Sequence, residues 1–368
     1  MRILDQDNLY SSSKTVSTIH FGFGSINKLQ SILDEKIKDS NKGFPLFFVD
    51  VFFKRSLFFK KIVKYSGKYK VVFINTNSEP TTSKIDEIVN NLKLKNILPN
   101  IIVGIGGGSV LDTAKAVSNM LTNSGNSSNF QGWDLLKKPG VYKIGIPTIS
   151  GTGSESTRTC VLIDKKKKIK LGMNSDYTLF DEVILDPNLT ATVPKNQFFY
   201  TGMDTFIHCI ESLNGSHRNL LSDSLSEQAL DLATSCFSSE DMQDNNSREK
   251  LMIASFLGGQ AISMSFVGLI HPLSAAISVV YGTHHCLANC IVMRAMEEYY
   301  PKEYDFFWKL VKEKKIKIPR NILNNIDKKI EKLVNSTLIH EKPLKNALGD
   351  NFKKHLSVDK LTELFKMM

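Results

Sequence analysis

The feature that most constrains the fold is a buried strand that runs directly into a helix through three glycines. The segment NIIVGIGGGSVLDTAKAVSNML has an apolar run at 101–105, then Gly106–Gly108, then apolar residues at helical spacing. Ser109, with Asp112 three residues later, matches a capping box at a helix start. The free N–H groups there favour an anion, so we predict a pyrophosphate site, with a ligand-free turn as the alternative. The turn departs from G-x-G-x-x-G because Ser109 replaces the last glycine.

The chain changes its pattern near residue 190. Before it, strands expected at 44–53, 69–76, 101–105, 142–149 and 182–186 alternate with helices expected at 25–37, 53–65, 81–96 and 109–122. Such alternation predicts a parallel, doubly wound sheet. Beyond it, helical periodicity dominates, with helices expected at 198–213, 219–237, 246–265 and 271–281. We therefore expect an α/β domain over 1–190 and a helical domain over 191–368.

Four residues of the second half form a candidate metal site. Asp204 and His208 are four residues apart in TGMDTFIHCIES, so they share one face of the expected helix, and His271 and His285 follow fourteen apart. Three imidazoles and one carboxylate suit a divalent first-row metal with room for a substrate oxygen, which indicates Lewis-acid chemistry. The alternative is that these histidines are ordinary core residues.

A third segment, IGIPTISGTGSESTRTCVLID, combines an apolar strand with a loop of glycines and hydroxyl side chains. Small residues with hydroxyl donors suit contacts to phosphate, ribose or an amide. A plain loop rich in Ser, Thr and Gly is the alternative.

Composition is that of a globular protein of 368 residues with a formal net charge of +10. The lysine-rich runs at 60–70 and 164–170 accompany no nucleic-acid motif, so we expect no nucleic-acid partner and favour an anionic substrate. The N-terminus has no apolar signal segment, and the aromatic run at 45–60 is broken by charges, so we expect a cytoplasmic protein without a membrane segment. Five cysteines without a C-x-x-C pair indicate free thiols, and Cys209 and Cys286 are read as packing residues rather than soft metal ligands.

Several segments together resemble the iron-containing (group III) alcohol dehydrogenases, which have the dehydroquinate synthase-like fold. The matching stretches are GGGSVLDTAKA, PTISGTGSE, ILDPNLTATVP, GMDTFIHCIES and the His271/His285 pair. The resemblance implies an α/β N-terminal Rossmann-like domain plus an all-α C-terminal domain, with the site between them, and we expect a homodimer. It implies a divalent metal, Fe²⁺ or Zn²⁺, on Asp204, His208, His271 and His285. It also implies NAD or NADP on a set of residues comprising Asp50, Gly107, Gly108, Ser109, Asp112, Thr148, Thr152, Ser154, Lys170 and Leu189. In the family, an aspartate near the position of Asp50, at the end of a strand, favours NAD over NADP, because it can bind the ribose and repel a 2′-phosphate. The alternative is that Asp50 belongs to a solvated turn or caps one.

Within that family the chain is similar to the 3-deoxy-manno-octulosonate (Kdo) 8-oxidase branch, through FQGWDLLKKP, LGMNSDYTLFD, FFYTGMD and YGTHHCLANC. This implies oxidation of the C8 hydroxyl of Kdo, an anionic sugar acid, to an aldehyde. A partner aminotransferase would then make 8-amino-Kdo for lipopolysaccharide. The branch name implies oxygen as the acceptor, whereas the glycine loop implies a dinucleotide. The alternatives are a generic NAD-dependent alcohol dehydrogenase or aldehyde reductase, a dehydroquinate synthase-type cyclase, and a non-catalytic paralogue.

The chain also departs from the family pattern. The usual second histidine four residues after the His271 position is Ala275, and we expect His284 to serve as the proton relay instead. The usual Thr-Thr pair is Thr148-Ile149, and the usual Asn-Pro pair is Glu79-Pro80.

Overall fold

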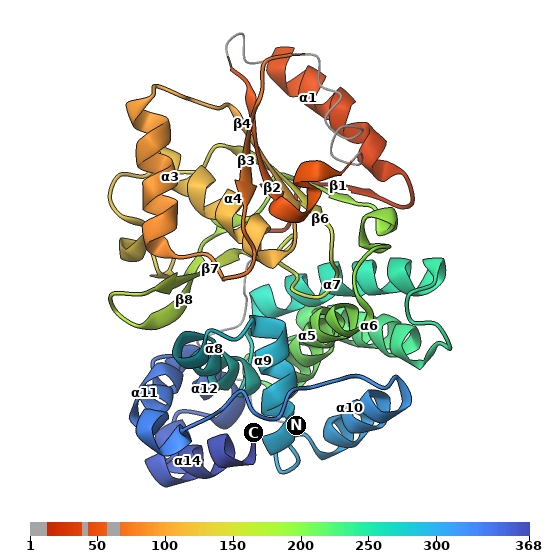
Figure 1. The fold of residues 1–368 in the computed structure, drawn as a ribbon, viewed down its shortest axis with the longest axis vertical. Coiled ribbons are helices and arrows are strands. Elements are labelled where there is room, and N and C mark those ends of the chain that lie inside the picture. The colour runs from red at the N-terminus through yellow and green to blue at the C-terminus, as the bar shows by residue number, and fades with distance from the viewer. Residues whose placement is uncertain (1–12, 39–42, 57–66) are drawn as a thin grey trace.

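The first half of the chain builds a six-stranded parallel sheet, as expected (Figure 1). The structure is a computed structural model, and it describes residues 13–38, 43–56 and 67–368. The strand order is β1-β9-β6-β4-β2-β3, and every paired neighbour is parallel. The strands are β1 (Thr18–Phe21), β2 (Pro45–Asp50), β3 (Lys70–Ile74), β4 (Ile101–Gly106), β6 (Tyr142–Pro147) and β9 (Glu182–Leu185).

Helices cover both faces of this sheet, because the side chains of its strands alternate between two apolar layers. In β2, Leu46 and Phe48 pack with α3 (Thr82–Leu94) and α4 (Gly108–Thr122). Phe47 and Val49 pack on the other face with α1 (Leu29–Lys38). The doubly wound arrangement predicted from the sequence is therefore present.

A second, small sheet was not predicted. It consists of β5 (Gly132–Trp133), β8 (Ile169–Asn174) and β7 (Thr159–Asp164), with β7 and β8 antiparallel. In β7, buried and partly buried residues alternate, as in a strand with one covered face. The alternation was missed in the sequence because β7 follows a segment rich in Ser and Thr and is joined to β8 by a turn of four lysines.

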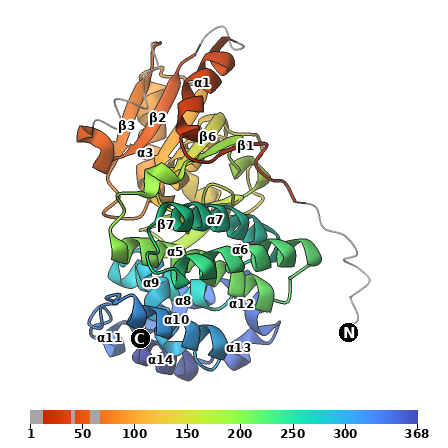
Figure 2. The same cartoon turned by 90° about the vertical axis from the view of Figure 1, so that its right-hand side faces the viewer.

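The second half is helical and lies beneath the sheet layer in Figures 1 and 2. Its helices are α5 (Lys195–Asn214), α6 (Leu220–Ser238), α7 (Asn245–Ser265), α8 (Ile270–Tyr281), α9 (His285–Val292), α10 (Pro301–Glu313), α11 (Ile326–Leu338), α12 (Glu341–Leu348), α13 (Phe352–His355) and α14 (Val358–Met367). Nearly all of α5 is buried, as expected of a helix packed on all sides. We keep residue 190 as the proposed domain boundary, since β9 ends at Leu185 and α5 begins at Lys195.

Two local predictions need comment. The capping box is wrong, because α4 begins at Gly108, its N-cap is Gly107, and no side chain caps it. The helix expected at 53–65 is a short 3-10 helix, η3 (Val51–Arg55), as far as the chain is described, and 57–66 lie outside the described residues. Residues 1–12, on which the signal-peptide prediction rests, also lie outside them.

No single helix in the described part of the chain is long and apolar enough to cross a membrane. Within the residues that the structure describes, α7 and α8 pass that test as a pair, and they are bent by 103° relative to each other. Their apolar residues belong to the protein core.

Candidate active site

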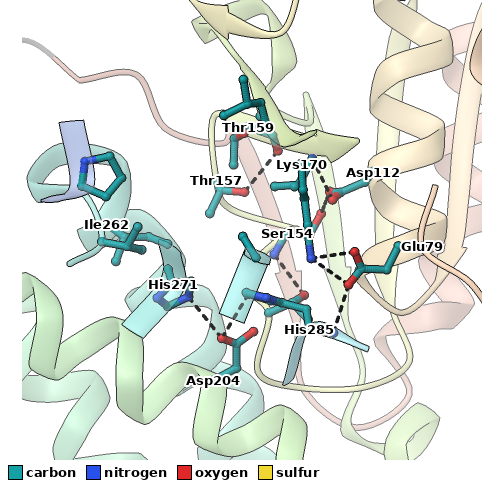
Figure 3. Close-up of a pocket in the computed structure, with 18 of the residues that line it drawn as sticks. Glu79, Asp112, Ser154, Thr157, Thr159, Lys170, Asp204, Ile262, His271 and His285 are labelled. Atoms are coloured by element: carbon teal, nitrogen blue, oxygen red, sulfur yellow. Dashed lines mark hydrogen bonds and ion pairs between the residues drawn. The ribbon is translucent and has the colours of Figure 1, made fainter. Parts of the chain in front are cut away.

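One cavity of about 340 Å³ lies where the carboxyl edge of the sheet meets the helical half. Its lining includes Gly108 and Ser109 after β4, Lys170 of β8, and Asp204 of α5 (Figure 3). In open parallel sheets this edge is where ligands bind, because the strands end there and the helix N-termini point to it.

The four predicted metal ligands converge on one point of this cavity. Asp204 and His208 come from successive turns of α5, His271 from the start of α8, and His285 from the first turn of α9. The Asp204 Oδ1 atom lies 3.6 Å from Nε2 of His208, 3.4 Å from Nε2 of His271 and 3.7 Å from Nε2 of His285. Ligand atoms at 2.0–2.1 Å from a tetrahedral metal are about 3.4 Å apart. The ligand atoms of Asp204, His208 and His271 all lie within 4.8 Å of one another, so these three could hold a divalent ion, and His285 stays the proposed fourth ligand.

A surrounding layer of side chains orients these ligands. Glu211, one turn beyond His208 on α5, accepts a hydrogen bond from His271 Nδ1 and another from the backbone N–H of Ile270. Nε2 of His271 is buried and has no hydrogen-bond partner. Because Glu211 holds the proton on Nδ1, the Nε2 lone pair is free for a metal, as in carboxylate–histidine–metal triads. Sequence reasoning missed Glu211, although its position seven residues after Asp204 places it on the same helix face.

Asp204 is held from its other side by α9. Asn289 Nδ2 donates to Asp204 Oδ1 at 2.6 Å, and Cys286 Sγ donates to Oδ2 at 3.4 Å. Burial raises the pKa of Cys286 well above its ordinary value, so it stays a thiol and acts as a donor. Asn289 was also missed, and its signal is the four-residue spacing from His285. The five cysteines are buried and free, as expected.

The members of the cluster differ in their protonation states. Burial raises the pKa of Asp204, but the imidazoles of His208 and His285 outweigh this, so the carboxyl stays ionised well below its usual range. Burial lowers the pKa of His208 to about 4, so its imidazole is neutral at physiological pH. Burial also lowers the pKa of His271, but Glu211 and Asp204 reverse this and raise it to about 9. A metal therefore competes with a proton at His271.

The opposite wall contains part of the predicted cofactor set. The residues of that set that line the cavity are Gly108, Ser109, Asp112, Thr152, Ser154 and Lys170. Asp112 accepts from Ser154 Oγ at 2.6 Å and from the Val161 N–H at 3.0 Å, so it joins the loop after β6 to α4 and β7. Burial raises its pKa.

Lys170 forms an ion pair with Glu79, which the sequence analysis noted only as a departure from the family's usual Asn-Pro pair. Its Nζ lies 2.7 Å from Oε1 and 2.6 Å from Oε2 of Glu79, and Glu79 Oε1 also accepts from the His285 N–H at 3.0 Å (Figure 3). Glu79 thus connects the α/β wall to the first turn of α9, which carries a candidate metal ligand.

The other predicted site residues lie elsewhere. Gly107 and Thr148 are adjacent in sequence to residues that line the cavity, but they do not line it themselves. Leu189 is buried in the hydrophobic core on one face of the sheet. Asp50 accepts hydrogen bonds from the Phe52 N–H and the Thr76 hydroxyl at the end of β2. His284 lines the cavity as the exposed N-cap residue of α9.

The glycines of the loop after β6 serve tight packing. Gly151 has φ +144°, and a Cβ there would lie 1.6 Å from the Thr201 carbonyl oxygen of α5. Gly153 has φ +62°, and its Cβ would meet the Gly259 backbone of α7 at 2.7 Å. The loop is therefore pressed against both helices, and only glycine fits at these points.

The sequence matches one protein family in both halves. Residues 17–187 match the family described as iron-containing alcohol dehydrogenase, and residues 198–349 match the C-terminal part of the Fe-containing alcohol dehydrogenase family.

Curated relatives and solved structures agree with this match. A sulfoacetaldehyde reductase of Bilophila wadsworthia is 35% identical over 219 residues, which are 59% of this chain and 56% of that protein. An NAD-dependent methanol dehydrogenase of Bacillus methanolicus is 29% identical over 63% of this chain and 61% of its own. These matches thus span little more than half of each relative.

The fold is also that of solved structures. A 1,3-propanediol oxidoreductase superposes with TM-score 0.81 at 20% identity, covering 96% of this chain and 98% of its own. The sulfoacetaldehyde reductase of Bifidobacterium kashiwanohense, solved in complex with NAD⁺, gives 0.80 at 20% identity and covers 98% of both chains. With both halves matched in chain order and the candidate ligands gathered in one cavity, the chain belongs to the iron-containing alcohol dehydrogenase family.

Proposed function

We propose that this protein is a metal-dependent, NAD-linked oxidoreductase that interconverts alcohols and aldehydes. The observation that carries the proposal is that the Asp204/His208/His271/His285 cluster and the glycine turn at Gly108 open into the same cavity. A hydride acceptor and a group that polarises the substrate oxygen are the two requirements of this reaction, and the two walls offer one each.

The residues divide the work as follows. When bound, a divalent metal supplies Lewis-acid polarisation of the substrate oxygen, and a nicotinamide accepts the hydride. Asp204 and the three histidines would hold the metal, and Glu211 would keep His271 in the ligating tautomer. Gly108 and Ser109, at the start of α4, would bind the diphosphate of the cofactor through backbone N–H groups. We assign His284, exposed on the cavity wall, to pass the hydroxyl proton to solvent.

The test is an NADH absorbance assay on protein loaded with Fe²⁺ or Zn²⁺, with a panel of aldehydes and alcohols. Chelation should abolish turnover and metal should restore it. Turnover that is unchanged without metal would refute the metal role, and NADH that stays unchanged while a ring-closed product forms would favour a cyclase.

For the substrate we propose the C8 alcohol of Kdo, whose aldehyde a partner aminotransferase would convert to an amino sugar. The support is the resemblance of the NSDYTLFD, FFYTGMD and YGTHHC segments to that branch, together with Ala275. This small side chain lines the cavity on α8, one turn from His271, and leaves room for a polyol.

This substrate proposal predicts a ratio of kcat/KM values. Kdo should exceed ethanol and glycerol in kcat/KM by more than about tenfold, or about 1.4 kcal/mol of transition-state binding. Equal or better turnover of short alcohols would instead favour a generic alcohol dehydrogenase or aldehyde reductase, as the names of the sulfoacetaldehyde reductase and the methanol dehydrogenase suggest for those proteins. We propose NAD over NADP on account of Asp50, and the ratio of the two KM values tests it.

We also propose a homodimer. Strand β1 is an edge of the sheet, and its side chains Ile19 and Phe21, with the following Phe23, are exposed by 39%, 69% and 43%. Exposed apolar residues on an unpaired edge strand favour pairing with another chain. Light scattering coupled to size exclusion would give the mass directly.

A further inference from the structure

The wall of the cavity formed by the start of α12 has no role in the proposed function. His340, the N-cap residue of α12, and Lys342 line the cavity there, and Trp133 of β5 and Phe266 at the end of α7 line it as well. These residues come from three distant parts of the chain, and only the fold brings them together.

Lys342 is held by aromatic rings rather than by an acid. Its Nζ lies 4.0 Å from the ring centroids of both Trp133 and Phe266, and those rings pack edge to face at 5.1 Å. Among the ion pairs of the described residues, none includes Lys342. The nearby acid Asp134 already pairs with Arg158. A half-buried ammonium group over two rings therefore lines the cavity, with Asp134 nearby but with no ion pair of its own among the described residues.

His340 adds a second unsatisfied group. Its Nε2 is buried and has no hydrogen-bond partner. Burial, with Lys170 and His271 nearby, lowers its pKa to about 4, so the imidazole is neutral and has one N–H to donate. A buried polar atom without a partner is costly unless a ligand satisfies it.

The aromatic part of this wall is fixed in place at some strain. Phe266 has φ +64° and ψ +166°, a region that residues other than glycine seldom adopt. Asn346, buried in the same helix as Lys342, donates to the carbonyls of Phe266 and Val267 at 3.4 and 3.0 Å. Helix α12 therefore both supplies Lys342 and positions the ring on which it rests.

We propose that Lys342 and His340 form a subsite for the anionic end of the substrate, an oxyanion of the carboxylate, sulfonate or phosphonate type. This inference rests on the proposed function, since the reacting end of the same molecule would lie at the Asp204 cluster. The ammonium supplies the charge and the neutral imidazole supplies one N–H donor, while Trp133 and Phe266 pack on the ammonium and shield its contact from water. The cofactor diphosphate is a second possible anion, but the neighbours of Lys342 come from β5 and the end of α7, not from the turn between β4 and α4.

The first test measures binding without turnover. The chain has two tryptophans, so Trp308→Phe leaves Trp133 as the only one and makes its fluorescence a reporter of the subsite. Ethanesulfonate, which cannot react, should change this fluorescence saturably, and Lys342→Met should weaken its binding by about tenfold or more. The matched control is Lys345→Met on the same helix, whose ammonium lies 3.6 Å from Asp350 and which should bind like the parent. Equal affinity in the Lys342→Met protein would overturn the proposal.

The second test compares a charged and a neutral aldehyde of equal length, succinic semialdehyde and butanal. Lys342→Met should raise KM for the charged aldehyde by about tenfold while changing that for butanal by less than about twofold, and Lys342→Arg should restore part of the preference. A parallel loss for both aldehydes would show a structural role and refute the subsite. A raised KM for NADH would assign Lys342 to the cofactor instead. If the parent protein reduces neither aldehyde, the panel with Kdo decides the proposed function separately, and ethanesulfonate binding still decides the subsite.

Discussion

The two walls of the cavity are built in different ways. On the helical wall, Asp204 and His208 are on one helix, and the three imidazole Nε2 atoms lie within 3.7 Å of one carboxylate oxygen. On the α/β wall, the predicted cofactor residues come from several separate elements, among them the start of α4, the loop after β6 and strand β8, and only part of them line the cavity. Gly108, Ser109 and Lys170 do, while Asp50 and Leu189 do not.

The difference has a physical origin. Residues four apart on a helix share a face whatever surrounds them, so the spacing of Asp204, His208 and Glu211 transfers directly into space. Loop residues are placed by what the loop packs against, here α5 and α7 beneath Gly151 and Gly153. We therefore expect single substitutions on the helical wall to cause larger losses of metal binding and activity than the losses of cofactor binding caused by single substitutions on the α/β wall.

The largest effect is expected from removing a ligand of the helical wall. His271→Ala should leave less than about a tenth of the metal and lower kcat/KM by about a thousandfold, because the polarising group is lost. Metal analysis after dialysis and the NADH assay measure this. His355→Ala, an exposed histidine of α13, is the control. Full metal occupancy in His271→Ala would remove this residue from the ligand set.

A smaller loss of metal affinity is expected from changing Glu211, which contacts the ligand His271. Glu211→Gln keeps the side-chain shape but removes the charge that holds the His271 proton on Nδ1. Metal affinity, measured by competition with a chelator, should weaken by about ten- to a hundredfold. Glu227→Gln, exposed on α6, should have no effect. Unchanged affinity would mean that Glu211 only caps the start of α8.

The α/β wall should respond through the cofactor alone. Gly108 lines the cavity, and a Cβ there would lie 3.1 to 3.3 Å from Thr152. Gly108→Val should therefore weaken NAD binding by about tenfold in calorimetry, with metal content unchanged. Gly107→Val is less informative, since its Cβ would first displace Ile149, 2.6 Å away. Unaltered NAD binding in Gly108→Val would make the turn purely structural.

The smallest effect concerns stability and pH. Folding lowers the pKa of His340 from 6.5 to about 4, so the unfolded chain takes up the proton first as the pH falls. His340 therefore does not lower the free energy of unfolding above pH 6.5, but it lowers it increasingly as the pH falls from 6.5 to 4. His340→Asn should reduce the acid-dependent loss in urea unfolding of the metal-free protein by about 1 to 2 kcal/mol. An identical pH slope in both proteins would show that His340 is not shielded from water.

The sequence by itself determined much of this protein. Strand–helix alternation predicted the parallel sheet, helical periodicity predicted α5 to α8, and the Asp204–His208 spacing predicted the metal cluster, because all three are short-range rules. Only the tertiary structure decided which of the predicted cofactor residues line the cavity, and that Glu79 pairs with Lys170. It also decided that Lys342 lies over Trp133 and Phe266, and that Nε2 of His340 is buried without a partner. These contacts join residues tens to hundreds of positions apart, and no local pattern records which of them the packed core brings within reach.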